Sequence, residues 1–268
     1  MKTSSRTRIA IATTAVVLLS AHTTPAFPAP ASEQARRAAA PQDLADQLAA
    51  NDRELRAAID SWLTVAGDPP GRQAPEEVIE PALLLQRKVL FMARHPNAAG
   101  ATIGLLSEAL AKQVGELTEA ARKLRRLAGD APPRQLRIGK PRPLAELVGY
   151  YGAAERRYGI EDSYLAAINL VETKFGRVKS DSVSGAKGPM QFLPSTWRIY
   201  GRGGDIHDPH DAILAAARLL RDAGAPSSYA RALHAYNPSK LYVQAVTLYA
   251  RVLARDPYAI RFLYCWGP

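Results

Sequence analysis

Apolar residues recur at steps of three and four along most of this chain, a spacing that places them on one face of a helix. A first such stretch begins near Leu44 and ends before the turn-forming residues 67–71. A second runs from about Glu76 to Arg94 and stops at Pro96. The third has an apolar seam made of Ile103, Leu106, Leu110, Val114, Leu117, Ala121 and Leu124. The pattern predicts a helical hairpin or three-helix bundle over residues 42–128.

A segment rich in proline and arginine follows this bundle. Residues 129–143 include Pro132, Pro133, Pro141 and Pro143, a composition typical of an exposed linker. Helical patterns then return at about 144–157, 162–174, 209–223, 228–236 and 239–255, and no alternating strand pattern competes with them. We therefore expect an all-α (mainly α) protein, with a second domain over residues 144–268 whose core is separate from that of the bundle.

The N-terminus and the charge indicate where the protein acts. Lys2, Arg6 and Arg8 precede an apolar run, residues 9–20, that is too short to span a bilayer. This predicts a secretory signal peptide over residues 1–31, with an uncleaved anchor as the alternative. After cleavage we expect no membrane span and a location outside the cell, in the wall or on the periplasmic side of the membrane.

The formal charge of +10 becomes +7 when these three cations are subtracted, which suits an anionic partner such as a cell-wall polymer. Nucleic acid is not expected as a partner, because an exported chain rarely meets it and the sequence has no recognition motif.

Glu172 stands out by its position in the expected helix after Asp162. Leu165, Ile168 and Glu172 share one face of that helix, and Gly176 follows where a C-terminal cap is expected. A carboxyl at the end of an apolar face is partly desolvated, and its raised pKa suits a general acid near neutral pH. The ordinary alternative is a surface or salt-bridged glutamate.

Three motifs in order favour the catalytic interpretation. They are Glu172-Thr173-Lys174-Phe175-Gly176, then residues 184–197 with the sequence SGAKGPMQFLPSTW, then Ala235-Tyr236-Asn237. Together, over about residues 145–255, they resemble the lytic transglycosylases with a lysozyme-like domain, in particular the soluble and membrane-bound B-type branch. The resemblance implies a mainly α lysozyme-like fold with a groove for a glycan strand.

By this resemblance Glu172 is the catalytic residue, and five further residues are substrate-binding groove positions. They are Ser184, Met190, Gln191, Tyr236 and Asn237. Two glycines of the second motif, Gly185 and Gly188, would allow close backbone approach to the sugar rings. Met190 and Phe192 would offer apolar surface, unless they serve only as core.

Residues 205–211 (DIHDPHD) bring carboxylates and imidazoles together, as a metal site would. A helix start accounts for most of this pattern, with Asp208 as the N-cap, Pro209 at the first helical position and Asp211 in the first turn. We therefore expect no metal site, and the resemblance implies no cofactor.

A single carboxylate suffices when the sugar's own acetamido group assists. The resemblance implies that Glu172 protonates the β-1,4 oxygen between N-acetylmuramic acid and N-acetylglucosamine and then deprotonates the muramic 6-hydroxyl, which leaves 1,6-anhydro ends. One alternative is a hydrolytic lysozyme in which Asp181 is the second carboxylate. Another is a non-catalytic peptidoglycan-binding protein whose N-terminal helices bind a cell-wall protein partner. Glycan strands of peptidoglycan are the expected partner in every case.

Overall fold

The computed structural model describes residues 40–66, 73–129 and 135–267, and the predicted signal peptide, residues 1–31, lies outside them. These described residues contain eleven helices and no strand, so the all-α prediction is confirmed. Two isolated antiparallel bridges, Ile138 with Val178 and Lys187 with Phe192, are the β pairing that they contain. None of the helices in these ranges combines the length and the apolar character that a membrane crossing requires.

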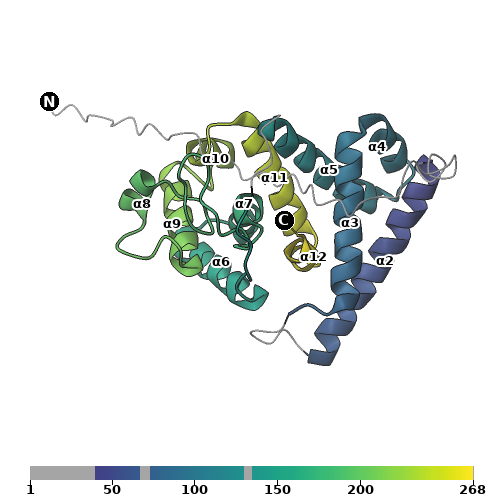
Figure 1. Cartoon of the computed structure of the whole chain (residues 1–268), viewed down its shortest axis with the longest axis horizontal. Coiled ribbons are helices and arrows are strands. Elements are labelled where there is room, and N and C mark those ends of the chain that lie inside the picture. The colour runs from purple at the N-terminus through teal and green to yellow at the C-terminus, as the bar shows by residue number, and fades with distance from the viewer. Residues whose placement is uncertain (1–39, 67–72, 130–134, 268) are drawn as a thin grey trace.

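Four helices form the N-terminal part: α2 (Pro41–Ala66), α3 (Glu76–Arg94), α4 (Pro96–Ile103) and α5 (Glu108–Ala128). Figure 1 shows α2 and α3 as a long pair, with α4 and α5 at one end of it. The predicted third helix was wrong in one respect, because the chain breaks between Ile103 and Glu108. Gly104 ends α4, and Ser107 has an extended backbone (ψ 151°) that starts α5.

The apolar period survives this break, which explains why the sequence did not show it. Ile103 ends α4 and Leu106 lies in the turn, where its N–H donates to the Ile103 carbonyl at 3.2 Å. Both side chains nevertheless pack against the hydrophobic core. A single continuous helix and two helices joined by this turn would therefore both direct Ile103 and Leu106 toward the core, so the apolar spacing does not distinguish them.

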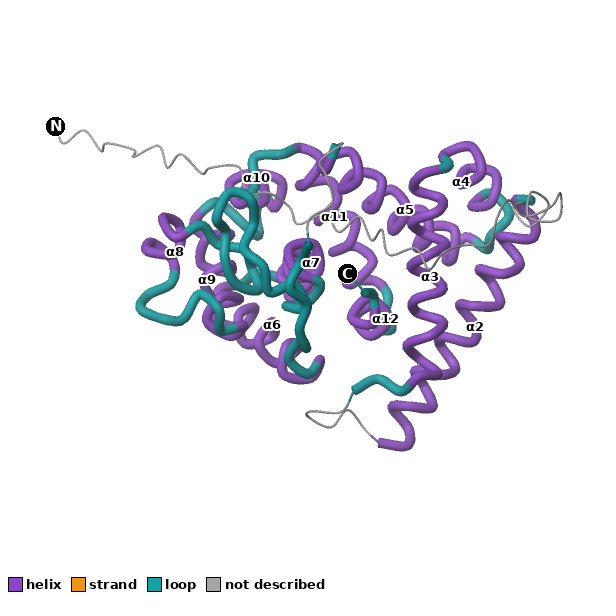
Figure 2. Tube along the Cα trace, in the orientation of Figure 1, coloured by secondary structure: helices purple, strands orange, loops and turns teal. Residues whose placement is uncertain are grey.

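The second part contains α6 (Leu144–Tyr158), α7 (Asp162–Thr173), α8 (Pro194–Tyr200), α9 (Pro209–Asp222), α10 (Tyr229–Tyr236), α11 (Lys240–Arg255) and α12 (Ala259–Cys265). Five of these match the predicted stretches to within two residues. The other two, α8 and α12, have seven residues each, too few for a helical period to show. Figure 2 shows that loops fill much of the space between α7 and α8.

One hydrophobic core joins the two parts, so the prediction of separate cores was wrong. α11 packs against α7 on one side and α5 on the other, and α12 packs against α3 (Figure 1). The buried apolar side chains form a single cluster that extends from Leu44 to Trp266. The physical reason is that α11 has a wide buried face, and α5 covers the portion that α7 leaves open.

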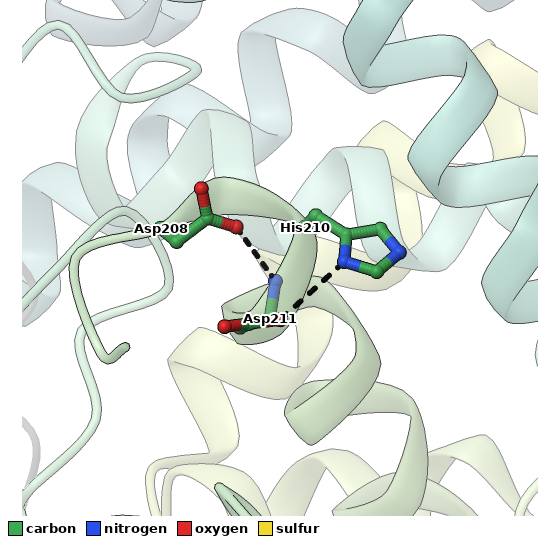
Figure 3. Close-up of side chains that lie close together, drawn as sticks. All are labelled: Asp208, His210 and Asp211. Carbon is green, nitrogen blue, oxygen red and sulfur yellow. Dashed lines mark hydrogen bonds and ion pairs between the residues drawn. The ribbon is translucent and has the colours of Figure 1, made fainter. Parts of the chain in front are cut away.

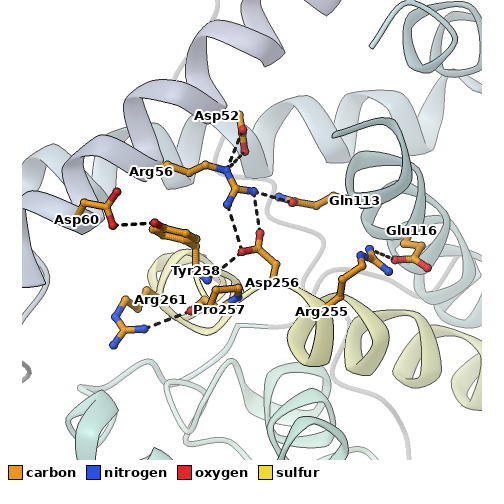
Figure 4. A network of polar contacts seen from close by, with 10 residues as sticks. All are labelled: Asp52, Arg56, Asp60, Gln113, Glu116, Arg255, Asp256, Pro257, Tyr258 and Arg261. Atoms are coloured by element: carbon orange, nitrogen blue, oxygen red, sulfur yellow. Dashed lines mark hydrogen bonds and ion pairs between the residues drawn. The ribbon is translucent and has the colours of Figure 1, made fainter. Parts of the chain in front are cut away.

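Polar contacts reinforce this junction (Figure 4). Arg56 of α2 donates to both carboxylate oxygens of Asp256, at 2.9 and 3.3 Å, just after α11 ends. The hydroxyl of Tyr258 donates to Asp60 of α2 at 2.7 Å. The C-terminal end of α11 is thus held to α2 by charge-assisted hydrogen bonds.

The predicted linker is held in place over its described residues 135–143. The N–H of Gly139 donates to the carbonyl of Arg177 at 2.9 Å, and the N–H of Lys179 donates to the carbonyl of Arg137 at 2.8 Å. A Cβ on Gly139 would lie 2.9 Å from Cε of Lys179, so a glycine allows the two segments to approach. This segment therefore forms a wall beside the end of α7.

Candidate active site

Glu172 lies in the last turn of α7, a helix whose residues from Leu165 onward are all buried. The helix ends at Thr173, and the chain reverses through Lys174, Phe175 and Gly176, which all have positive φ (52°, 59° and 81°). The predicted cap at Gly176 is therefore displaced. Lys174 is the C-cap, and its N–H donates to the Leu170 carbonyl at 3.1 Å.

The carboxyl group of Glu172 is completely buried, with 0% of the residue exposed. The hydroxyl of Tyr242 donates to its Oε1 at 2.8 Å. Its Oε2 is also buried and has no hydrogen-bond partner among the described residues. Burial raises the pKa of Glu172 to about 8, although the hydrogen bond from Tyr242 acts in the opposite direction.

Tyr242 is a site residue that the sequence interpretation missed. It lies in the first turn of α11 and is itself fully buried. The sequence contained one indication of its burial: Tyr242, Val246 and Tyr249 lie on the apolar face of the helix expected at 239–255. A buried tyrosine hydroxyl usually has a hydrogen-bond partner, so the search for one leads to a buried polar group on another helix.

Tyr236 lies beside this pair, and Asn237 follows it at the end of α10. The ring of Tyr236 stacks on that of Tyr242, with centroids 6.4 Å apart and planes 6° apart. The Tyr236 hydroxyl donates to the carbonyl of Met190, which ties α10 to the loop before α8. Asn237 is the buried C-cap of α10, and its Oδ1 accepts from the N–H of Ser239 at 3.2 Å.

The loop that carries Met190 is fastened to α7 on the turn that bears Glu172. The carbonyl of Pro189 accepts from Thr173 Oγ1 at 2.6 Å and from Asn169 Nδ2 at 2.9 Å. Tyr151 of α6 in turn donates to Asn169 Oδ1 at 2.7 Å. These buried hydrogen bonds fix the loop against the end of α7.

Three predicted roles in this loop change. Met190 and Phe192 are 0% and 3% exposed, so they belong to the core instead of offering surface to a sugar. Gly188 has φ +72°, and a Cβ there would lie 1.8 Å from the carbonyl oxygen of Ile206. It is the loop before α9, not a sugar ring, that requires a glycine at this position.

Gln191 and Ser184 differ in their surroundings. Gln191 is 2% exposed and has a positive φ of 48°. Its Nε2 donates to the Gly188 carbonyl at 3.0 Å, and its Oε1 is buried without a partner among the described residues. Ser184 is exposed in the turn before Gly185. The structure thus links Met190 to the Glu172–Tyr242 pair through Tyr236, and it leaves Ser184 on the surface of the loop.

The carboxylate considered as a second catalytic group lies on the surface. The Asp181 side chain is 43% exposed and pairs with Lys187 at 3.8 Å. Burial by the surrounding residues and the hydroxyl of Tyr242 determine the pKa of Glu172. Within the described ranges, the arrangement therefore provides one carboxyl with a shifted pKa and a tyrosine, and not a carboxylate pair.

The helix start predicted at residues 205–211 is confirmed in its main features (Figure 3). Asp208 is the N-cap of α9, and its Oδ1 accepts from the N–H of Asp211 at 3.1 Å. The carboxylate of Asp211 accepts from the N–H of Asp205 at 3.0 Å and lies 3.4 Å from Nδ1 of His210. Hydrogen bonds within the loop thus already account for the clustering of these side chains.

Comparison with known proteins gives one match. Residues 149–254 match the family model described as "Transglycosylase SLT domain". The match extends from α6 to α11 and includes Glu172, Tyr242 and the predicted groove residues. No curated protein and no solved structure matches the chain significantly.

Proposed function

Because this chain carries a transglycosylase SLT domain, the lysozyme-like all-α fold of lytic transglycosylases that act on peptidoglycan, we propose that Glu172 is its catalytic acid and base. The bond cleaved is the β-1,4 linkage between N-acetylmuramic acid and N-acetylglucosamine, and the product has a 1,6-anhydro-muramic end. The observation that carries this proposal is the buried carboxyl with one oxygen held by Tyr242 and the other without a partner. The catalytic domain is assigned to residues 144–268.

The first step requires a protonated carboxyl. With a pKa of about 8, Glu172 is mostly protonated at pH 7. Tyr242 donates to Oε1, so the proton resides on Oε2. Oε2 then donates this proton to the glycosidic oxygen as the bond from that oxygen to the muramic anomeric carbon breaks.

The second step requires the same group as a base. The muramic acetamido oxygen stabilises the positive anomeric carbon, so no second carboxylate is needed. The Glu172 anion, stabilised by the hydrogen bond from Tyr242, removes the proton of the muramic 6-hydroxyl. The 6-oxygen bonds to the anomeric carbon, the carboxyl regains its proton, and no water is consumed.

Access to Glu172 is a conformational step. Both the carboxyl of Glu172 and Tyr242 are fully buried. A glycan strand therefore reaches Oε2 only when the side chains that cover the carboxyl move apart. Closure over the bound sugar then restores the desolvation that keeps the carboxyl protonated.

Two other functions have less support. A hydrolytic lysozyme would use Asp181 as its second carboxylate, but that group is exposed and paired with Lys187. A non-catalytic binding protein has no need for a buried carboxyl with a raised pKa, which costs folding free energy at neutral pH.

We also propose that the protein is exported and that its N-terminal helices bind a partner. Peptidoglycan lies outside the cytoplasm, in agreement with a signal peptide over residues 1–31 and a secreted or wall-associated protein. The four N-terminal helices remain a candidate surface for a cell-wall protein partner. That surface excludes the faces of α3 and α5 that pack against α12 and α11.

Mass spectrometry of purified sacculi treated with the protein tests the function. We expect muropeptides lighter by one water than hydrolysed ones. Glu172→Gln should lower turnover by at least about 100-fold, because proton transfer is lost. Glu161→Gln, at the exposed opposite end of the same helix, is the matched control and should retain activity.

Asp181→Asn separates the two catalytic alternatives. Under the transglycosylase mechanism this variant keeps most of its activity. Only reducing muramic ends in the digest, together with loss of activity in Asp181→Asn, would establish a hydrolase instead.

A further inference from the structure

A cavity of about 220 Å³ lies at the junction of the two parts of the molecule. Its walls come from the start of α3, from the segment before α6, from the turn after α7 and from the end of α12. Figure 1 shows α12 beside α3 at this junction. The cavity is separate from the catalytic groups, because neither Glu172 nor Tyr242 lines it.

Most of the cavity lining is apolar. Its apolar residues are Ala74, Ile79, Pro141, Pro143 and Cys265. The ring of Tyr264 adds to this surface, while its hydroxyl is engaged elsewhere and donates to the carbonyl of Arg142 at 2.8 Å. A ligand that fits these walls therefore has an apolar body, because polar groups buried here without hydrogen bonds would cost free energy.

Arg177 brings a positive charge into this lining. Its Nη1 donates to the carbonyl of Lys174 at 3.3 Å, and its guanidinium carbon lies 4.6 Å from the centroid of the Tyr264 ring. Nε and Nη2 of Arg177 have no hydrogen-bond or ion-pair partner among the described residues. Burial lowers the pKa of Arg177, so its charge is already partly removed from water.

No carboxylate in the described part of the chain pairs with Arg177. The ionisable side chains that act on its pKa are Tyr264 and Cys265. Burial raises the pKa of both, so both are uncharged at neutral pH. The acid that acts on Tyr264 is Glu146, which already pairs with Arg142 at 3.8 Å. Arg177 thus contributes N–H donors and a charge that its neighbours do not neutralise.

Lys174 adds a second positive charge to the same turn. It is partly buried, and it too has no ion pair within the described ranges. Burial, and then the charge of Arg177, lower the pKa of Lys174 to about 8. Charged groups that are removed from water are normally paired in proteins, so two unpaired cations on one turn favour the binding of an anion.

The apolar walls favour a monoanion with an apolar body. A guanidinium whose Nε and Nη2 are both available matches a carboxylate, which accepts two parallel hydrogen bonds. A phosphate dianion would bring a second charge, and Lys174 does not line the cavity to contact it. An uncharged apolar molecule would leave the guanidinium unpaired.

We propose that this cavity binds a small carboxylate with an apolar body, with the carboxylate at Arg177 and the body between the start of α3 and the end of α12. The ligand would contact the N-terminal part and the turn that follows Glu172 at the same time. It would thereby fasten the N-terminal part to the helix that carries the catalytic carboxyl. The site does not depend on the proposed reaction, because no step of that reaction uses it.

Calorimetry on the purified protein tests the ligand class. It compares hexanoate with hexanol, which lacks the charge, and with inorganic phosphate, which lacks the apolar body. We expect hexanoate to bind more tightly than either. Arg177→Gln should weaken hexanoate binding by about tenfold, since a hydrogen bond to a charged group is worth at least about that factor. Lys140→Gln is the matched control and should bind as the parent does, because Lys140 lies on the same segment before α6 but lines a larger cavity that Arg177 does not line.

The single cysteine of the chain gives a measurement at the site on the unchanged sequence. Cys265 lines the cavity, so a bound ligand should shield its thiol. We expect hexanoate to slow the alkylation of Cys265 by iodoacetamide more than hexanol or phosphate does at the same concentration. This protection also decides the matter if circular dichroism shows that Arg177→Gln is not folded.

Equal binding of hexanoate and hexanol, or unchanged hexanoate binding by a folded Arg177→Gln protein, would overturn the proposal. Hexanoate that binds without slowing the alkylation of Cys265 would also overturn it, as would phosphate that binds more tightly and requires Arg177. Loss of hexanoate affinity in Lys140→Gln would place the ligand in the larger cavity instead. A protein that binds hexanoate at Arg177 but leaves sacculi uncut would refute only the proposed function.

Discussion

Tyr242→Phe isolates the contribution of one hydroxyl to the proposed catalysis. The substitution keeps the ring that stacks on Tyr236 and removes the donor that holds Oε1 of Glu172 at 2.8 Å. Oε2 has no partner among the described residues, so the variant leaves both carboxyl oxygens without one. The protonated carboxyl tolerates this loss better than the anion does.

The size of the effect follows from that contact. A hydrogen bond to a charged group contributes about 1.5–3 kcal/mol. Since one pKa unit corresponds to about 1.4 kcal/mol, the pKa of Glu172 should rise by about one to two units. The anion formed after proton donation loses the same stabilisation, so kcat at pH 7 should fall by about tenfold to a hundredfold.

The pH dependence of kcat gives the sharper test. In the wild type, activity should decline as pH rises through about 8, because the general acid loses its proton. In Tyr242→Phe this alkaline limb should move to higher pH. Tyr249→Phe is the control, because Tyr249 is buried on the same helix about two turns further along.

A Tyr242→Phe enzyme with a lower kcat but an unmoved alkaline limb would refute the reasoning. Glu172 would then not be the group that titrates, or Tyr242 would act only by packing. Thermal unfolding of both variants should accompany the kinetics, so that a general loss of stability is not mistaken for a change in pKa.

Three other predictions concern the framework. Gly188→Ala should cost at least about 2 kcal/mol, because its Cβ would collide with the Ile206 carbonyl at a positive φ, and thermal denaturation measures the loss. Asp256→Asn should lower the free energy of unfolding in urea by about 1–3 kcal/mol, because Arg56 loses one of its two charged partners and keeps only Asp52, and the change should be smaller at high salt. The fragment 144–268 should unfold at a lower temperature than the whole chain or associate in gel filtration, and a stable monomeric fragment would contradict the packing of α11 on α5.

The sequence predicted those features that depend on neighbours along the chain. Helical periods located most helices, and three local motifs singled out Glu172, Met190, Tyr236 and Asn237 as candidate site residues. The contact between Glu172 and Tyr242 joins residues 70 positions apart, and no local pattern specifies such a pair. Burial of Glu172 was expected only in part, because full desolvation depends on the helices that pack around α7.

Two further differences have the same origin. Proline content indicates that a segment cannot be a helix, but it does not reveal that Arg137 and Gly139 will pair with the distant turn at residues 177–179. A glycine in a motif indicates close approach, but not by what. At Gly188 the group that approaches closely is the carbonyl of Ile206. This contact forms only when the loop before α9 folds against residue 188.

The position of α11 between α5 and α7 bears on how the matched domain could be transferred to another protein. Tyr242, which donates a hydrogen bond to Glu172, lies on α11, and another face of this helix packs against α5, outside the matched residues 149–254. A graft of residues 149–254 onto a carrier protein would therefore contain Glu172 and Tyr242 but not the helix that supports α11. A substitute for α5 would have to be designed together with the graft. Changes in how this substitute helix packs against α11 would shift Tyr242 and so adjust the position of the Glu172 carboxyl.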